Sequence, residues 1–105
     1  MTITYRPPAY ERGIIAQIMG DFTDWIPINM SMYPVSEQIR DATKVGVFFV
    51  KVKLIKGFRY KYKFVWREYE TVDENWHIRV ETDGKKNNFI EVQDDNMTVA
   101  DFIQD

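Results

Sequence analysis

Hydrophobic and basic residues alternate most regularly over residues 45–66. Side chains of a strand point to alternate faces, so this pattern predicts two strands, each with an apolar face and a basic face. The apolar positions are Phe48, Val50, Val52 and Leu54 in the first half, and Tyr60, Tyr62, Phe64 and Trp66 in the second. A loop at residues 56–58 would join the strands as a hairpin whose apolar faces share one side, with Phe48 opposite Trp66.

The same hairpin register places lysines opposite one another, with Lys51 beside Lys63 and Lys53 beside Lys61. Like charges in directly opposed positions destabilise a sheet. We therefore expect acidic or polar groups close to these lysines. The basic face is then either a solvated surface flanked by glutamates from a neighbouring strand or a surface that faces a ligand.

Shorter patterns predict further elements on both sides of this hairpin. Residues 2–6 end at Pro7-Pro8, which indicates a short edge strand or an arm, because proline cannot donate to a sheet. Residues 11–20 predict the first core strand. The remaining expectations are a turn carrying Trp25, a long loop over 29–44 with a helical turn near 36–42, short strands at 67–72, 76–81 and 89–92, and turns at 73–75 and 83–84.

Several short strands separated by turns predict an all-β protein, an antiparallel immunoglobulin-like β-sandwich of about seven to eight short strands. The 105 residues are expected to form a single domain. Its core module would cover about residues 13–92, between an N-terminal arm over 1–12 and an acidic C-terminal tail over 93–105. Within that tail, Met97, Ala100 and Phe102 could form one helical turn.

Composition limits the classes of function. The net charge is −2, so bulk electrostatics give no reason to expect a nucleic acid partner. Anion or RNA binding on the hairpin lysines is only a minor alternative. The absence of cysteine excludes a disulfide framework and a thiolate metal site, and no apolar leader or membrane span is apparent. We expect a cytoplasmic protein without a membrane partner.

Catalytic chemistry finds little support in the sequence. His77 is the only histidine, and there is neither a Gly-x-Ser-x-Gly motif nor a phosphate-binding glycine loop. The adjacent acids Asp73-Glu74 and Asp94-Asp95 diverge on an extended chain and are poor acid–base pairs. We therefore expect a protein that is not an enzyme and that uses neither a metal nor another cofactor.

The residues that remain for function are aromatic rings and hydrogen-bonding side chains near turns. A sugar presents apolar C–H faces ringed by hydroxyl groups, so its site needs exposed rings with polar groups at their edges. Trp25, Lys63 and Asn87 could supply such a set. The alternatives are that Trp25 closes one end of the core, that Lys63 is a solvated strand lysine, and that Asn87 caps a turn.

Four short motifs follow one another along the chain. They are Gly20–Trp25 (GDFTDW), Tyr60–Val65 (YKYKFV), the acidic turn at 73–75 followed by Gly84, and Asn87–Val92 (NNFIEV). In this order they resemble the glycogen-binding carbohydrate-binding module of AMP-activated protein kinase beta subunits and of starch-branching and debranching enzymes. The resemblance runs from about residue 13 to residue 92. It implies a β-sandwich that binds α-glucan oligosaccharides or polysaccharides without catalysis.

The resemblance also assigns individual positions. Trp25 would stack on a sugar, and Lys63 and Asn87 would bind hydroxyl groups. At the position of the family's second stacking tryptophan this chain has Glu70, so Tyr69 is the candidate substitute.

The turn at Gly84 departs from the family as well. Asp83 and Lys85 flank this glycine, where the family has an apolar residue and a threonine. A second hypothesis is therefore a degenerate carbohydrate-binding-module fold that serves as a structural protein–protein interaction module within a larger assembly.

Overall fold

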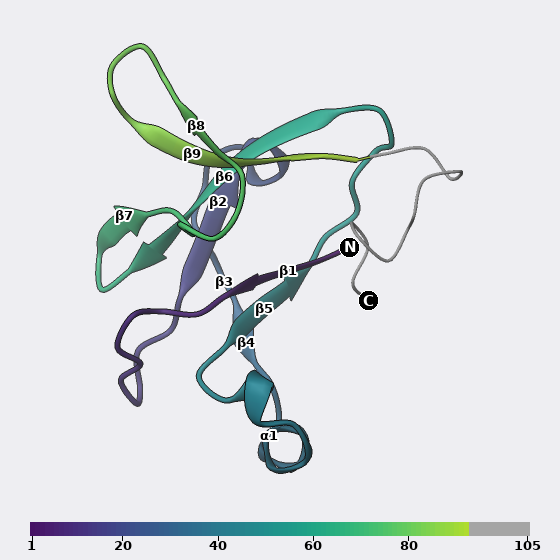
Figure 1. The fold of residues 1–105 in the computed structure, drawn as a ribbon, viewed down its shortest axis with the longest axis vertical. Coiled ribbons are helices and arrows are strands. Elements are labelled where there is room, and N and C mark those ends of the chain that lie inside the picture. The colour runs from purple at the N-terminus through teal and green to yellow at the C-terminus, as the bar shows by residue number, and fades with distance from the viewer. Residues whose placement is uncertain (93–105) are drawn as a thin grey trace.

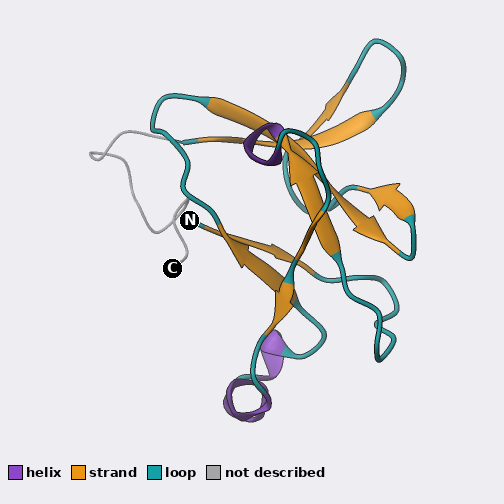
Figure 2. Cartoon of the chain, turned by 180° about the vertical axis from the view of Figure 1, so that it is seen from behind, coloured by secondary structure: helices purple, strands orange, loops and turns teal. Residues whose placement is uncertain are grey.

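The computed structural model of the chain describes residues 1–92 as two antiparallel sheets with few helical turns (Figures 1 and 2). The smaller sheet has the order β1 (Thr2–Tyr5), β5 (Phe48–Lys51) and β4 (Ser31–Met32). The larger sheet has the order β3 (Ile28–Asn29), β2 (Gln17–Gly20), β6 (Arg59–Trp66), β9 (Lys86–Glu91) and β8 (Ile78–Val80), and β7 (Tyr69–Thr71) also pairs with β6. The expected β-sandwich is confirmed.

The helical elements lie in and around the connections between strands. The helix α1 (Val35–Arg40) follows β4, and short 3-10 turns cover Asp21–Thr23 and Ala42–Lys44. The helical turn predicted near residues 36–42 is thus present. The turn predicted in the C-terminal tail lies outside the described residues. Within residues 1–92, no helix is long and apolar enough to cross a membrane.

The predicted hairpin of β5 with β6 is wrong, because the two strands belong to different sheets. Lys51 lies opposite Thr2 of β1, and Lys61 lies opposite Phe89 of β9, so the opposed lysine pairs do not form. Alternation along a strand determines which face is apolar, but it does not select the neighbouring strand. Residues 52–58 cross from one sheet to the other instead of making a tight turn.

The two apolar faces meet across the core of the sandwich. The ring centroids of Phe48 and Trp66 are 5.8 Å apart, although their strands are not neighbours in a sheet. Tyr5 stacks on Phe64 with a centroid separation of 4.4 Å, which joins β1 to β6 through the core. Both predicted apolar faces are therefore confirmed. Burying each large side chain contributes roughly 1.5–3 kcal/mol.

The first strand of the larger sheet is shorter than predicted. Only Gln17–Gly20 of the expected residues 11–20 are extended in a sheet, because the chain turns at Gly13 (φ 89°). At the other end, Gly20 lies against β6 so closely that a Cβ atom there would collide with the Lys61 carbonyl and with Tyr62. This close approach brings the turn after Gly20 alongside β6.

Candidate functional site

The outer face of the larger sheet carries the polar residues singled out in the sequence. On β6, Tyr62 and Phe64 point into the core, so Lys61 and Lys63 point away from it. On β9, Asn88 and Ile90 are buried toward the inside, and Asn87 takes the opposite face. The β6–β9 register pairs Tyr62 with Asn88, and its continuation by one residue brings Lys63 opposite Asn87.

The turn after Gly20 holds Trp25 at the edge of this face. The Thr23 hydroxyl accepts a hydrogen bond from the Gly20 N–H (2.9 Å) and donates to the Gly20 carbonyl (3.1 Å). Asp24 and Trp25 then adopt left-handed backbone conformations, and the Trp25 N–H donates to the Gly20 carbonyl. This local geometry turns the indole outward. Its side chain is 38% exposed, so Trp25 does not close the core.

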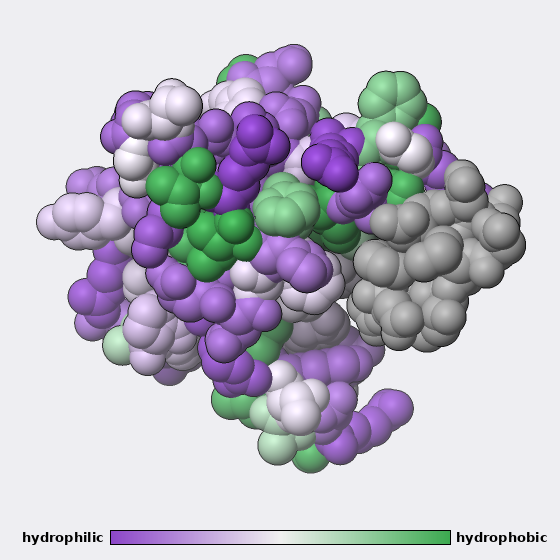
Figure 3. Space-filling view, turned by 45° about the horizontal axis from the view of Figure 1, so that its top comes forward, coloured by the Kyte–Doolittle hydropathy of each residue, from purple (hydrophilic) through white to green (hydrophobic). Residues whose placement is uncertain are grey.

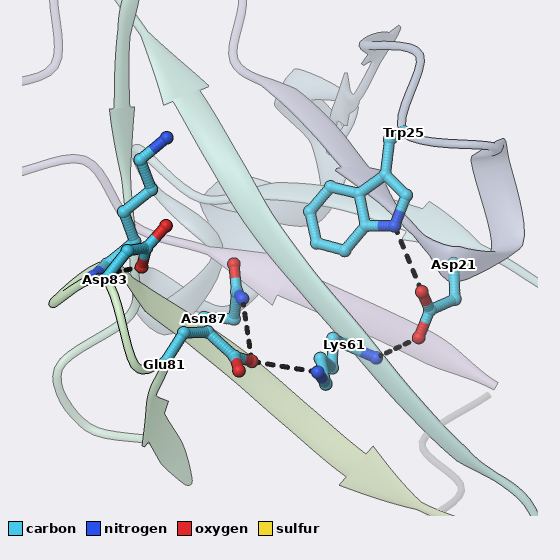
Figure 4. A network of polar contacts seen from close by, with 7 residues as sticks. Asp21, Trp25, Lys61, Glu81, Asp83 and Asn87 are labelled. Atoms are coloured by element: carbon cyan, nitrogen blue, oxygen red, sulfur yellow. Dashed lines mark hydrogen bonds and ion pairs between the residues drawn. The ribbon is translucent and has the colours of Figure 1, made fainter.

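Asp21 fixes the indole to the neighbouring strand. Its Oδ1 accepts a hydrogen bond from Trp25 Nε1 (3.0 Å), and its Oδ2 accepts one from the Lys61 backbone N–H (2.8 Å). Figure 4 shows the carboxylate between the indole and β6. Because both carboxylate oxygens are engaged, the ring is held in a defined position relative to the sheet.

The polar contacts continue from β6 to the β8–β9 hairpin. Lys61 Nζ lies 2.9 Å from Glu81 Oε1, and Asn87 Nδ2 donates to the same oxygen over 3.4 Å. The hydrogen bond from Lys61, together with the weaker one from Asn87, lowers the pKa of Glu81 below its ordinary value. The network thus joins Trp25 to Asn87, which lie on either side of β6 (Figure 4).

The orientation of the Asn87 amide leaves one atom without a partner. Its Nδ2 faces the Glu81 carboxylate, so its Oδ1 points elsewhere, and this buried oxygen accepts no hydrogen bond from residues 1–92. A buried acceptor without a donor costs about 1–3 kcal/mol. The residue is only 8% exposed. Asn87 is therefore a buried, incompletely hydrogen-bonded polar group on this face and not a solvated turn cap.

Lys63 is also largely covered, with 9% of the residue exposed. Its Nζ lies 3.0 Å from Oε1 of Glu70, whose side chain is 60% exposed. The pair borders a shallow pocket of about 370 Å³, which Thr71, Lys85 and Lys86 also line. Lys63 is thus not a solvated strand lysine. It is a buried ammonium group balanced by one exposed carboxylate.

Tyr69 does not lie on the same face as these residues, because side chains alternate between the two faces along β7. It lies opposite Trp66, which faces the core, whereas Glu70 lies opposite Val65 and so shares the side of Lys63. The Tyr69 side chain is 77% exposed. The structure gathers Trp25, Lys63 and Asn87 around one face, and it places Tyr69 on the other side of the strand.

Sequence reasoning missed the residues that connect the site. Asp21 was visible only as part of a turn motif, Lys61 only as one of several basic residues, and Glu81 only as a polar position in a strand pattern. Glu70 and Glu81 meet the expectation of acidic groups near these lysines, although the opposed lysine pairs that led to it do not form. Among the described residues, no group of three or more histidine, aspartate and glutamate side chains is placed to hold a metal ion.

Comparison with known proteins assigns the chain to a family. No curated protein matches the chain. The family described as the glycogen recognition site of AMP-activated protein kinase matches residues 10–98, which include the turn of Trp25 and the strands of Lys63 and Asn87. The match covers most of the 105 residues. The chain therefore belongs to the family of the glycogen recognition site of AMP-activated protein kinase.

Proposed function

We propose that the chain is a non-catalytic module that binds α-glucans on the outer face of its larger sheet, with Trp25, Lys63 and Asn87 as the contacting residues. The observation that carries this proposal is the partly exposed indole of Trp25, which Asp21 holds against β6. A fixed ring loses little entropy when a ligand stacks on it, and preorganisation of this kind favours binding.

The chemistry around the indole suits a sugar. The ring offers an apolar surface to the C–H face of a glucose unit, and Lys63 supplies ammonium donors for hydroxyl oxygens. Within residues 1–92, Asn87 Oδ1 accepts no hydrogen bond, and in the proposed complex a sugar hydroxyl that reaches this buried atom supplies one. The oxygen is then satisfied in the complex and unsatisfied in the ligand-free protein, which favours the complex.

The surface character agrees with a hydroxyl-rich ligand. Figure 3 brings forward the upper part of Figure 1, where β6, β8 and β9 lie. This side of the molecule is mainly hydrophilic, with small hydrophobic areas in place of one broad apolar patch. Broad apolar patches are typical of surfaces that bind other proteins. A sugar needs only isolated apolar platforms among polar groups, and this pattern provides them.

Titration with maltoheptaose tests the proposal. We expect Trp25→Ala to weaken binding about fivefold to 150-fold, because stacking on an aromatic ring contributes roughly 1–3 kcal/mol by analogy with nucleic acid bases. Trp76→Ala is a matched control, since Trp76 is 37% exposed and donates its Nε1–H to the Phe89 carbonyl instead of joining the network. Absence of binding at millimolar sugar, or equal affinity for Trp25→Ala and the unchanged protein, contradicts the proposal.

Tyr69 enters the proposal only for long ligands. Because it lies on the other side of β7 from Lys63, we assign it to contacts with glucans that extend around this edge. Tyr69→Ala should then weaken maltoheptaose binding and leave the binding of maltotriose unchanged. A loss of affinity for both ligands would show that the ring lies at the central site.

One observation favours the second hypothesis of a degenerate sugar face in a protein-interaction module. Helix α1 exposes two apolar side chains one turn apart, Val35 (70% exposed) and Ile39 (80% exposed). Such a pair fits a contact with another protein. This alternative is favoured if the chain binds no glucan and forms a stoichiometric complex that Val35→Ser and Ile39→Ser abolish.

A further inference from the structure

A pocket with mainly basic walls lies beside the proposed sugar-binding face. Lys63 of β6, Glu70 and Thr71 of β7, and Lys85 and Lys86 from the β8–β9 hairpin line it, and we call it the lysine pocket. Three lysines against one glutamate give these walls a net charge of +2 at neutral pH. The whole chain has a net charge of −2, so the pocket is a local reversal of sign.

The charges in the lysine pocket are only partly balanced. Glu70 already pairs with Lys63. Across residues 1–92, neither the ammonium group of Lys85 nor that of Lys86 forms an ion pair. Asp83 lies in the same hairpin turn, but its Oδ1 accepts the Lys85 backbone N–H (2.9 Å). Two ammonium groups therefore remain available to an anion.

The two partners of the Lys63–Glu70 ion pair differ in exposure, and this difference favours replacement of Glu70 by another anion. The Lys63 side chain is 11% exposed, whereas that of Glu70 is 60% exposed. A largely buried ammonium group needs a negative partner, because removing the partner leaves an uncompensated charge. Glu70, by contrast, is well solvated and can turn outward. An incoming anion can therefore replace the Glu70 carboxylate as the partner of Lys63.

On this basis we propose that the lysine pocket binds a phosphate monoester carried by the α-glucan, with Lys63, Lys85 and Lys86 as its ligands. The inference rests on the proposed function and specifies its substrate class. An unmodified glucan is neutral, so only a charged substituent can balance the excess positive charge of the pocket. A phosphate monoester carries a charge of about −1.5 to −2 at pH 7 and three acceptor oxygens. This charge matches the pocket better than the single charge of a sulfate ester or a uronate.

Titration with maltoheptaose and with maltoheptaose bearing one phosphate monoester tests the inference. We expect the phosphorylated sugar to bind about fivefold to tenfold more tightly, as two partly exposed charge pairs would allow. This preference should shrink at high salt, because salt screens exposed charges. Equal affinity for the two sugars at low salt overturns the inference.

Three variants test whether the preference for the phosphorylated sugar arises in the lysine pocket. The Lys85→Ala, Lys86→Ala double variant should lose the preference, and Lys53→Ala, an exposed lysine outside the pocket, should retain it. Glu70→Gln should increase the preference, because it removes the competing carboxylate. A preference that survives the double change overturns the inference even if Glu70→Gln fails to fold.

The pattern of binding among the ligands distinguishes failure of this inference from failure of the proposed function. Binding of inorganic phosphate without binding of either sugar would support the pocket as an anion site and contradict glucan recognition. Binding of both sugars with equal strength would support glucan recognition and contradict the pocket. Maltoheptaose carrying a sulfate ester should bind more weakly than the phosphorylated form, and equal binding of these two contradicts the choice of phosphate.

Discussion

At the scale of single residues, the position of Asn87 follows from two neighbours that do not touch a ligand in the proposal. Glu81 attracts the Asn87 amide nitrogen, and Lys61 holds Glu81 over 2.9 Å. The carboxamide is thereby oriented with its oxygen away from Glu81. In the proposed site, Glu81 and Lys61 are therefore positioning residues for Asn87, and we expect this effect to need the charge of Glu81.

Loss of that charge should change stability in a pH-dependent way. Contacts with Lys61 and Asn87 lower the pKa of Glu81 in the folded state. They therefore stabilise the fold above the unfolded pKa of about 4.3, and this contribution is lost as the pH falls through the folded pKa. At neutral pH, Glu81→Gln should have a lower melting temperature than the unchanged protein, and the difference should shrink toward acid pH.

Melting curves across this pH range, compared with those of Glu74→Gln, check the prediction. Glu74 lies exposed in a turn, and its side chain makes no hydrogen bond or ion pair with the described residues. A difference for Glu81→Gln that stays constant down to the lowest pH would show that the charge is not responsible.

At the scale of elements, the site depends on how closely β2 approaches β6. Gly20 stands opposite Tyr62, and the contact leaves no room for a Cβ atom. Its φ of −177° is an ordinary extended value, so the requirement for glycine here is steric. The turn that carries Asp21 and Trp25 begins at this point, and the spacing of the two strands thus determines where the indole lies.

Gly20→Ala should therefore damage both stability and binding. We expect a loss of about 1–3 kcal/mol in the free energy of unfolding, the usual range for overpacking. Urea unfolding measures this loss, and maltoheptaose affinity should fall with it. Gly57→Ala is the comparison, because a Cβ atom there meets no other atom within 4 Å, so the change strains only the left-handed backbone (φ 84°) and causes no collision. Equal effects of the two changes on binding would contradict the steric argument.

The sequence predicted elements better than it predicted their partners. Alternation identified the apolar faces of residues 48–54 and 60–66 because burial acts on each strand separately. It assigned β5 to β6, whereas β5 pairs with β1 and β4, because hydrogen-bond partners come from segments distant in sequence. For the same reason, Asp21 and Lys61, 40 residues apart, could not be connected. Trp25, Lys63 and Asn87 were grouped instead by the chemistry that a sugar site needs and by the resemblance of short motifs.

At the scale of the whole molecule, the sandwich is closed by aromatic side chains from both sheets. Phe48 from the smaller sheet is 1% exposed and contacts Trp66 of the larger one. Phe64 stacks on Tyr5 in the same way. These contacts place four aromatic rings between the two sheets, where they pack with buried aliphatic side chains such as Ile18 and Ile90.

Truncation of Phe48 should be costly. Phe48→Ala should lower the free energy of unfolding by about 3–5 kcal/mol, because it leaves a cavity between the sheets. Phe58→Ala is the matched control, since Phe58 is 58% exposed in the crossing segment and should change stability by less than about 0.5 kcal/mol. Chemical denaturation followed by tryptophan fluorescence measures both. Similar losses for the two variants would contradict the assignment of the core.

The pairing of β2 with β6 has a consequence for how the protein is made. Among residues 1–92, it is the only strand pairing that joins residues 1–51 to residues 59–92. During synthesis, the segment containing Trp25 leaves the ribosome well before the strand that must receive it. All strands of the smaller sheet lie within residues 1–51, so they are synthesised before the first residue of β6. The nascent chain therefore completes the proposed sugar-binding face late, after the smaller sheet has had time to assemble.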